Sequence, residues 1–124
     1  AFVSRDHPWA GRKGIRLGDL DGQPMVLRES GSNTRRVFET AVVGAGVAPK
    51  VVLEIESGEA IREAVVAGHG IGVYGEKSLP QDERIKVLPI VDTDIRLNRY
   101  LACLNERRHE LLVDAFFDVA GELV

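Results

Sequence analysis

Residues 25–45, MVLRESGSNTRRVFETAVVGA, contain the transition that decides the fold. The stretch opens with three consecutive apolar residues, Met25 to Leu27, which is typical of a short buried strand. After a polar loop, apolar residues return at helical spacing, at Val37, Phe38, Ala41, Val42 and Ala45. The end of that helix is predicted by Gly44, Gly46 and Pro49. A strand that passes directly into a helix is the repeating unit of an α/β fold.

The same alternation continues on both sides of this stretch. Further apolar patterns predict short strands over residues 1–4, 51–55, 71–74 and 85–88, and a longer strand over residues 95–104. Two more helices are expected, one capped by Ser57 and one at the end of the chain, with an apolar face at Leu112, Ala115, Phe116, Val119 and Leu123. We therefore predict an α/β fold whose mostly parallel sheet is flanked by helices.

Composition and charge exclude several classes of protein. The 124 residues are 44% hydrophobic and 28% charged, which is ordinary for a soluble globular domain with one core. Sixteen basic and 19 acidic residues give a net charge of −3, so the chain lacks the basic excess of nucleic-acid-binding proteins. Its apolar runs are too short to span a bilayer. The lone Cys103 forms no internal disulfide and favours a reducing, cytoplasmic location.

No metal or cofactor is expected from the sequence. His7, His69 and His109 are far apart, and none has a second ligand at a spacing typical of zinc sites. The glycine-rich segments 44–46 and 68–72 follow predicted helices, whereas a dinucleotide-binding fingerprint lies between a strand and the helix after it. We interpret both segments as helix terminators and as places of close helix–strand packing.

The polar loop of residues 29–36, ESGSNTRR, is the strongest candidate for a binding site. Ser32 is placed to cap the following helix, whose first N–H groups have no partner within the helix. Arg35 and Arg36 fall in the first turn, where positive charge opposes the helix dipole. A bound anion reverses this penalty, because it accepts hydrogen bonds from N–H, hydroxyl and guanidinium groups. In open α/β sheets, ligands bind beyond the carboxyl ends of the strands, where this loop is expected to lie.

The candidate ligand contacts are therefore Arg28, Ser30, Ser32, Asn33, Thr34 and Arg35, together with Tyr74 at the end of another predicted strand. A purely structural interpretation of the loop is equally compatible with the sequence. In that interpretation the serine only caps the helix, and Arg35 or Arg36 pairs with Glu29 or Glu39. Core or rim packing is likewise an equal alternative for the tyrosine. No serine, histidine and carboxylate occur at a nucleophile spacing, so no catalytic residue is predicted.

Several stretches, taken in order, resemble the effector-binding domain of LysR-type transcriptional regulators. They are His7-Pro8-Trp9-Ala10, the segment 17–26, the segment 56–74 with its Gly-Ile-Gly-Val end, Arg99-Tyr-Leu-Ala, and the helix around Phe116-Phe117. Their order and spacing carry the resemblance, which covers nearly the whole chain. The resemblance implies a Rossmann-like lobe of a type 2 periplasmic-binding-protein-like fold, in a protein without catalytic activity.

The resemblance also implies how the chain divides. Residues 1–10 correspond to the strand and loop that leave a first lobe, residues 11–94 to the second effector-binding lobe, and residues 95–124 to the return strand and closing helix of the first lobe. The DNA-binding helix-turn-helix and most of the first lobe are then expected outside this chain. The implied partners are a small effector between two lobes, promoter DNA bound only through the helix-turn-helix, and further copies in a homo-oligomer, with no membrane.

By position in the family, the loop from Ser30 to Arg35 corresponds to effector contacts of the second lobe, and Tyr74 lies near another contact. Gly75 stands where many members have proline, and Arg35 and Arg36 make the loop more basic than usual. The basic loop favours a strongly anionic effector such as a carboxylate, phosphonate or sulfate. Two other classes stay open: a fragment of a periplasmic-type solute-binding protein, and an anion-binding enzyme whose only nearby carboxylate is Glu29.

Overall fold

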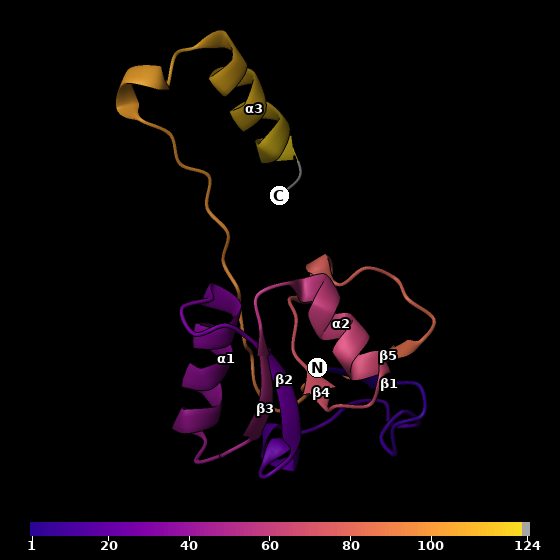
Figure 1. Cartoon of the computed structure of the whole chain (residues 1–124). Coiled ribbons are helices and arrows are strands. Elements are labelled where there is room, and N and C mark those ends of the chain that lie inside the picture. The colour runs from indigo at the N-terminus through magenta and orange to yellow at the C-terminus, as the bar shows by residue number, and fades with distance from the viewer. Residues whose placement is uncertain (123–124) are drawn as a thin grey trace.

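The computed structural model describes residues 1–122 of the chain. A sheet with helices on both faces is followed by an extended segment that runs away from this body and ends in a helix (Figure 1). The strands are β1 (Phe2–Ser4), β2 (Pro24–Arg28), β3 (Lys50–Ile55), β4 (Ile71–Gly72) and β5 (Ile85–Val87). The α-helices are α1 (Asn33–Gly44), α2 (Gly58–Val66) and α3 (Leu111–Glu122). The predicted α/β fold is confirmed.

The five strands form one mixed sheet in the order β3-β2-β4-β1-β5. β2 pairs in parallel with β3 and β4, whereas β1 pairs in antiparallel fashion with β4 and β5. The prediction of a mostly parallel sheet is therefore corrected to a sheet with two parallel and two antiparallel pairings. An apolar run in the sequence indicates a buried strand, but it carries no signal for the direction of the neighbouring strand.

β2 is buried on both faces, and each face is covered by one helix (Figure 1). On one face, α1 contributes to a core cluster that includes Met25, Leu27, Phe38 and Val42. On the other face, α2 contributes to a cluster that includes Phe2, Val26, Ile61 and Val65. This division follows from the alternating direction of side chains along a strand. In the apolar stripe predicted for α1, Phe38 and Val42 are buried and Val37 and Ala41 are half-buried, but Ala45 is exposed because it is the C-cap.

The centre of the sheet leaves no room for a side chain at Gly72. A Cβ atom at this position would lie within 2.9 Å of three atoms of the Phe2 ring. Phe2 is 0% exposed, so the ring has no free space into which it can move. Gly68, with a φ of +84°, ends α2 in the left-handed region that favours glycine. The glycine-rich segment therefore terminates a helix and allows close packing, as predicted.

The strand predicted over residues 95–104 is not formed. Within residues 1–122, no strand pairs with this extended segment. Ile95 packs against the core and Leu97 lies against Gly75, while Arg99 donates a hydrogen bond to the Ser78 hydroxyl. The alternating sequence pattern is that of a strand, but a strand also needs a neighbour whose backbone completes its hydrogen bonds.

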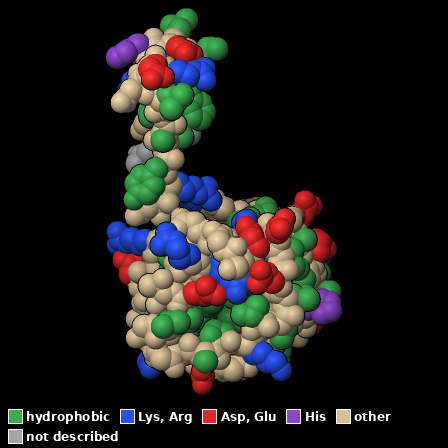
Figure 2. All heavy atoms as spheres, turned by 60° about the vertical axis from the view of Figure 1, so that its left-hand side comes forward, with side chains coloured by type: hydrophobic (Ala, Val, Ile, Leu, Met, Phe, Trp, Pro, Cys, Tyr) green, Lys and Arg blue, Asp and Glu red, His purple; other side chains and the backbone are tan. Residues whose placement is uncertain are grey.

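The predicted C-terminal helix is present as α3, but its apolar side chains face solvent. Leu111, Leu112, Phe116 and Val119 are between 58% and 84% exposed. Figure 2 shows hydrophobic side chains gathered on this projecting part of the molecule. Leu123, which belongs to the predicted apolar face, lies outside the described residues. Among the helices of residues 1–122, none combines the length and the apolar character needed to cross a membrane.

Candidate functional site

Three neighbouring strands bring their carboxyl ends to one edge of the sheet. β3, β2 and β4 are adjacent and run parallel to one another. The loop of residues 29–32 follows β2, Glu56 and Ser57 follow β3, and Tyr74 follows β4. Because α1 and α2 begin directly after β2 and β3, their N-termini lie at the same edge. The polar loop therefore lies beyond the carboxyl ends of parallel strands, as predicted.

The N-terminus of α1 keeps hydrogen-bond donors that its cap residue does not use. Ser32 is the N-cap, and its backbone carbonyl accepts a hydrogen bond from Arg36 N–H at 2.9 Å. The Ser32 hydroxyl forms no capping hydrogen bond, and the first turn of α1 contains no acidic residue. At α2, by contrast, the Ser57 hydroxyl accepts a hydrogen bond from Ala60 N–H at 3.3 Å, and Glu59 lies in the first turn. Of the two termini, that of α1 therefore has the more unused donors and is the better candidate for an anion site.

A tight turn presents this helix terminus to the edge of the sheet. Ser32 N–H donates a hydrogen bond to the Glu29 carbonyl at 3.1 Å. Between them, Gly31 has a φ of +100°, a conformation that side chains rarely adopt. Ser32 is buried, Thr34 is half-buried, and Ser30 and Asn33 are exposed. The turn thus gathers the four polar side chains predicted as ligand contacts around the start of α1.

Arg35 is committed to partners within the molecule. Its guanidinium group donates hydrogen bonds to Glu39 at 2.7 Å, to the Arg28 carbonyl at 3.0 Å, and to Glu54 at the end of β3. Only 13% of the side chain is exposed. The hydrogen bond with Glu39, and then that with Glu54, raises the pKa of Arg35 above its ordinary value. The pair with Glu39 is the one expected from the structural interpretation of the loop.

Arg36 makes a different and weaker connection on the surface of the loop. Its Nη2 atom donates a hydrogen bond to Asn33 Oδ1 at 2.5 Å, and both side chains are exposed. The two arginines of the first turn are therefore not equivalent. Arg35 is held by two carboxylates, whereas Arg36 is held by a neutral amide oxygen.

Arg28 and Tyr74 approach one another on the other side of the loop. Arg28 donates to the two carboxylate oxygens of Glu29 at 2.8 and 3.0 Å, and this interaction is the main reason that the pKa of Arg28 is raised. Tyr74 and Glu56 lie close enough to Arg28 to contribute to the same rise. The guanidinium group of Arg28 is therefore paired with Glu29 at the start of the loop and lies near Tyr74, which follows β4.

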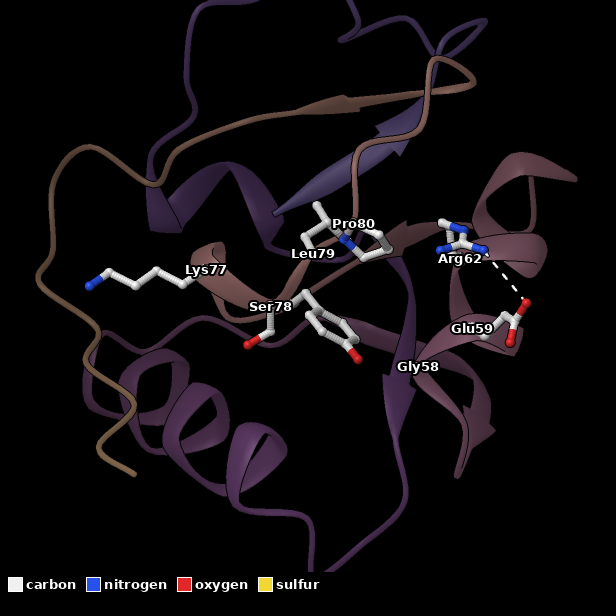
Figure 3. Close-up of a pocket in the computed structure, with 8 residues that line it drawn as sticks. Gly58, Glu59, Arg62, Lys77, Ser78, Leu79 and Pro80 are labelled. Atoms are coloured by element: carbon white, nitrogen blue, oxygen red, sulfur yellow. Dashed lines mark ion pairs between the residues drawn. The ribbon is translucent and has the colours of Figure 1, made fainter. Parts of the chain in front are cut away.

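A pocket of about 490 Å³ opens beside Tyr74. It is lined by the start of α2 and by the segment after β4, through Gly58, Glu59, Arg62, Tyr74, Lys77, Ser78, Leu79 and Pro80 (Figure 3). A Cβ atom at Gly58 would lie within 2.7 Å of three atoms of the Tyr74 side chain. The glycine therefore allows the tyrosine to lie on the start of α2. Tyr74 is half-buried and packs against the α2 core cluster, so it occupies the rim of this pocket.

An ion-pair network lies on the outer side of the pocket and ties α2 to the segment before β5. Arg84 donates to both carboxylate oxygens of Glu63 at 3.0 and 2.6 Å, and to those of Asp82 at 3.0 and 2.7 Å. Arg62 Nε lies 3.2 Å from Asp82 as an ion pair. These interactions, chiefly the hydrogen bonds from the Arg84 side chain, lower the pKa of Asp82 to about 2.

Stability in acid is expected to depend on Asp82. The fold lowers the pKa of Asp82 from 3.8 to about 2. The ionised carboxylate therefore stabilises the fold at pH values above 3.8, and this stabilisation is lost as the pH falls from 3.8 toward about 2. Asp82→Asn is therefore expected to be less stable than the wild type near neutral pH, and the two proteins are expected to converge in acid. Urea unfolding across this pH range measures the difference. Asp94→Asn, in an exposed pair with Arg96, serves as the control, and a constant difference across the range contradicts the prediction.

Three residues at this edge were missed by the sequence reasoning: Glu54, Glu56 and Gly58. All three lie at or just after the end of β3, which pairs in parallel with β2. The alignment of adjacent strand ends is the signal that identifies them, and it requires the order of strands in the sheet. Among residues 1–122, no group of three or more His, Cys, Asp or Glu side chains is placed to hold a metal ion.

The loops and the helix terminus at the carboxyl edge of the sheet have the arrangement typical of α/β lobes that bind small molecules. The family described as LysR substrate binding domain matches residues 1–124, the whole chain. The chain belongs to this family and is an effector-binding domain of a LysR-type regulator.

Relatives of known sequence and structure agree with this assignment. CysL, an HTH-type transcriptional regulator of Bacillus subtilis (strain 168), is 38% identical over 76 residues, 61% of this chain and 25% of its own length. CmpR, an HTH-type transcriptional activator of Synechocystis, is 30% identical over 120 residues, 94% of this chain and 40% of its own length. The chain therefore spans less than half the length of either curated relative.

The structural comparison supports the same fold. The CcmR regulatory domain of Synechocystis PCC6803, solved in complex with 2-PG, has a TM-score of 0.82 and 30% sequence identity, over 95% of this chain and 58% of that chain. The predicted lobe of a type 2 periplasmic-binding-protein-like fold is confirmed. Since these relatives are transcriptional regulators, they favour a regulator over the alternative of a solute-binding protein.

Proposed function

We propose that this chain is the second lobe of a sensor for a small anionic effector, and that the effector controls transcription through a DNA-binding helix-turn-helix elsewhere in the protein. The observation that carries the proposal is the N-terminus of α1, which lies at the carboxyl edge of the sheet without a side-chain cap or an acidic residue. The regulators CysL and CmpR, and the 2-PG complex of the CcmR domain, support it. The effector acts by shifting the equilibrium between conformations, so the proposed function is binding without catalysis.

The proposed ligand contacts are of three kinds. N–H groups at the start of α1 and the polar side chains of the loop donate hydrogen bonds to the anion, through Ser30, Ser32, Asn33 and Thr34. Arg28 supplies a positive charge, and the hydroxyl of Tyr74, which lies near Arg28, is a further donor. Arg35 holds the loop through its bonds to Glu39, Glu54 and the Arg28 carbonyl, and its charge offsets those of the two carboxylates beside the site.

Thr34→Val tests the proposed site, because it removes one hydroxyl from the first turn of α1 and conserves the side-chain volume. The full-length protein is titrated by calorimetry with 2-PG and inorganic phosphate, and with glycerol as an uncharged comparison. We expect the wild type to bind the anions in preference to glycerol. The variant is expected to bind 2-PG roughly tenfold more weakly, the effect of one hydrogen bond to a charged group.

Thr40→Val is the matched control for this experiment. Thr40 is exposed on the same helix, and its hydroxyl donates to the Arg36 carbonyl at 2.8 Å. We expect its affinity for 2-PG to equal that of the wild type. Equal losses in both variants, or a wild type that binds none of the anions, would contradict the proposed site.

We infer that residues 1–10 leave a first lobe, that residues 11–94 are the second lobe, and that residues 95–124 return to the first lobe and close it. The exposed apolar face of α3 supports this division, because a helix with such a face requires a packing partner. The extended segment before α3 supports it as well, since its alternating pattern fits a strand of another sheet.

This chain on its own is expected to self-associate through α3, since Leu112 and Phe116 are 83% and 60% exposed. Light scattering across a concentration series is expected to show a mass that rises with concentration. Phe116→Glu, which places a charge on the apolar face, is expected to give a monomer. Val43→Glu is the control, because Val43 is a 75% exposed apolar residue on α1. A wild-type chain that stays monomeric, or a Val43→Glu variant with the same effect, contradicts the prediction.

We infer further that the full-length protein is a cytoplasmic homo-oligomer that contacts promoter DNA only through its helix-turn-helix. The free thiol of Cys103 supports a reducing compartment. The net charge of −3 supports the proposal that this lobe carries no surface for the DNA backbone.

A further inference from the structure

We propose that Glu54 is a positioning residue of the effector loop, which holds Ser30 and Arg35 together so that the start of α1 stays directed at the effector. This inference rests on the proposed function of the loop. Glu54 lies near the end of β3, 19 residues beyond Arg35 in the sequence. It does not line the pocket beside Tyr74, and its side chain accepts hydrogen bonds from this loop and from the start of α1.

The two carboxylate oxygens of Glu54 bind different parts of the loop. Oε1 accepts a hydrogen bond from Ser30 N–H at 3.1 Å, and Oε2 accepts one from the Arg35 guanidinium group. The first bond fixes the backbone where the loop begins, and the second fixes the first turn of α1. Both bonds lower the pKa of Glu54, that from Arg35 more strongly, so the carboxylate stays ionised near neutral pH.

The connection extends to β2 through Arg35. Glu54 is paired with Leu27 in the parallel register of β2 and β3, one position before Arg28. The Arg28 carbonyl accepts a hydrogen bond from the same Arg35 Nη1 atom that binds Glu54. The side chains of Glu54 and Arg35 therefore link the ends of two strands to the start of one helix. A loop with a left-handed glycine at its centre has few other restraints, so this link is expected to define its conformation.

Glu39 offers a matched comparison. It also forms an ion pair with Arg35, at 2.7 Å, and its side chain is as exposed as that of Glu54, at 47%. It lies on the same helix as Arg35, four residues later, and makes no bond to the loop backbone. Removal of either carboxylate changes the charge around Arg35 equally, but only removal of Glu54 releases Ser30.

The test compares Glu54→Ala, Glu54→Gln and Glu39→Ala in the full-length protein. Hydrogen exchange by mass spectrometry reports on the backbone of residues 28–36 without added ligand. We expect Glu54→Ala to exchange about tenfold faster than the wild type in this segment, and Glu39→Ala to match the wild type. Glu54→Gln is expected to fall closer to the wild type, because its amide oxygen can still accept the Ser30 hydrogen bond.

Calorimetry with 2-PG provides the second readout. We expect Glu54→Ala to bind about tenfold more weakly than Glu39→Ala, because the donors at the start of α1 are no longer held in place. Equal exchange in the two alanine variants, or faster exchange across the whole domain in Glu54→Ala, overturns the positioning role. If the wild type binds neither 2-PG nor inorganic phosphate, the proposed function fails, and the exchange data alone decide the role of Glu54.

Discussion

Gly72→Ala is expected to lower the free energy of unfolding by about 2–3 kcal/mol, the cost of overpacking a rigid core. The new methyl group would lie within 2.9 Å of three atoms of the Phe2 ring. The ring is fully buried in the cluster that joins β2 to α2, and Gly72 is paired with Phe2 in the sheet. Relief of the clash therefore requires β1 to separate from β4. Urea unfolding of the wild type and the variant measures the difference.

Two further variants show whether the clash is the cause. Gly18→Ala is the control for a general effect of alanine, because nothing lies within 4 Å of a Cβ atom at Gly18. Phe2→Leu combined with Gly72→Ala is expected to cost less than the sum of the two single changes, since the residues are in direct contact. A Gly72→Ala variant as stable as the wild type, or a double variant with additive losses, contradicts the packing described at this position.

The two helices of the body show what the sequence predicts well. The apolar spacing around Phe38 and around Ile61 is local, and both residues are buried where that spacing places them. The helix ends are also local, because Gly46 and Gly68 adopt the left-handed conformations expected of terminators. Signals of this kind depend on neighbours within a few residues, so a short stretch of sequence contains them.

The sheet shows where such reasoning stops. The run Val51–Leu53 correctly predicts a strand, but it does not reveal that β3 lies at one edge of the sheet, with all three residues at least 37% exposed. Residues 95–104 have the alternation of a strand and form none here, since a strand depends on its neighbour as much as on its own sequence. Strand order and direction are properties of the whole chain, and no short window of sequence contains them.

The candidate site likewise contains residues that local sequence predicts and residues that only the fold brings together. Ser32 stands at the predicted N-cap position, which depends on the residues beside it, although its hydroxyl forms no capping hydrogen bond. The partners of Arg35 include Glu54, which reaches it only because β3 lies next to β2. The approach of Tyr74 to Gly58 likewise requires β4 and the start of α2 to meet at one edge. The sequence of the loop therefore predicts part of a site formed by several strand ends, and the other residues of the site can be identified only from the fold.

Arg35→Ala is expected to weaken anion binding by at least about tenfold and to lower the free energy of unfolding by about 1 kcal/mol. The change removes three hydrogen bonds at once, to Glu39, Glu54 and the Arg28 carbonyl. It also leaves two carboxylates near the effector loop without the cation between them. Their negative potential then opposes an anion at the start of α1, and the loss of the link to β2 and β3 loosens the same turn. Calorimetric titration of the full-length protein with 2-PG measures the loss of affinity. Titrations at low and moderate salt separate the effect of the negative potential, which salt screens, from the effect of the loosened turn.

Arg36→Ala separates position from charge in this experiment. It removes the same charge from the adjacent position, but the guanidinium group of Arg36 is exposed and, within residues 1–122, donates a hydrogen bond to Asn33 alone. We expect a loss of affinity of about twofold, and expect added salt to abolish it, because an exposed charge acts through screened solvent. Arg35→Lys keeps the charge but lacks the planar fork that serves three acceptors, so it is expected to recover only part of the affinity. Full recovery with lysine, or equal losses at the two arginines, would mean that the loop attracts anions by net charge and that the bonds of Arg35 do not hold it in shape.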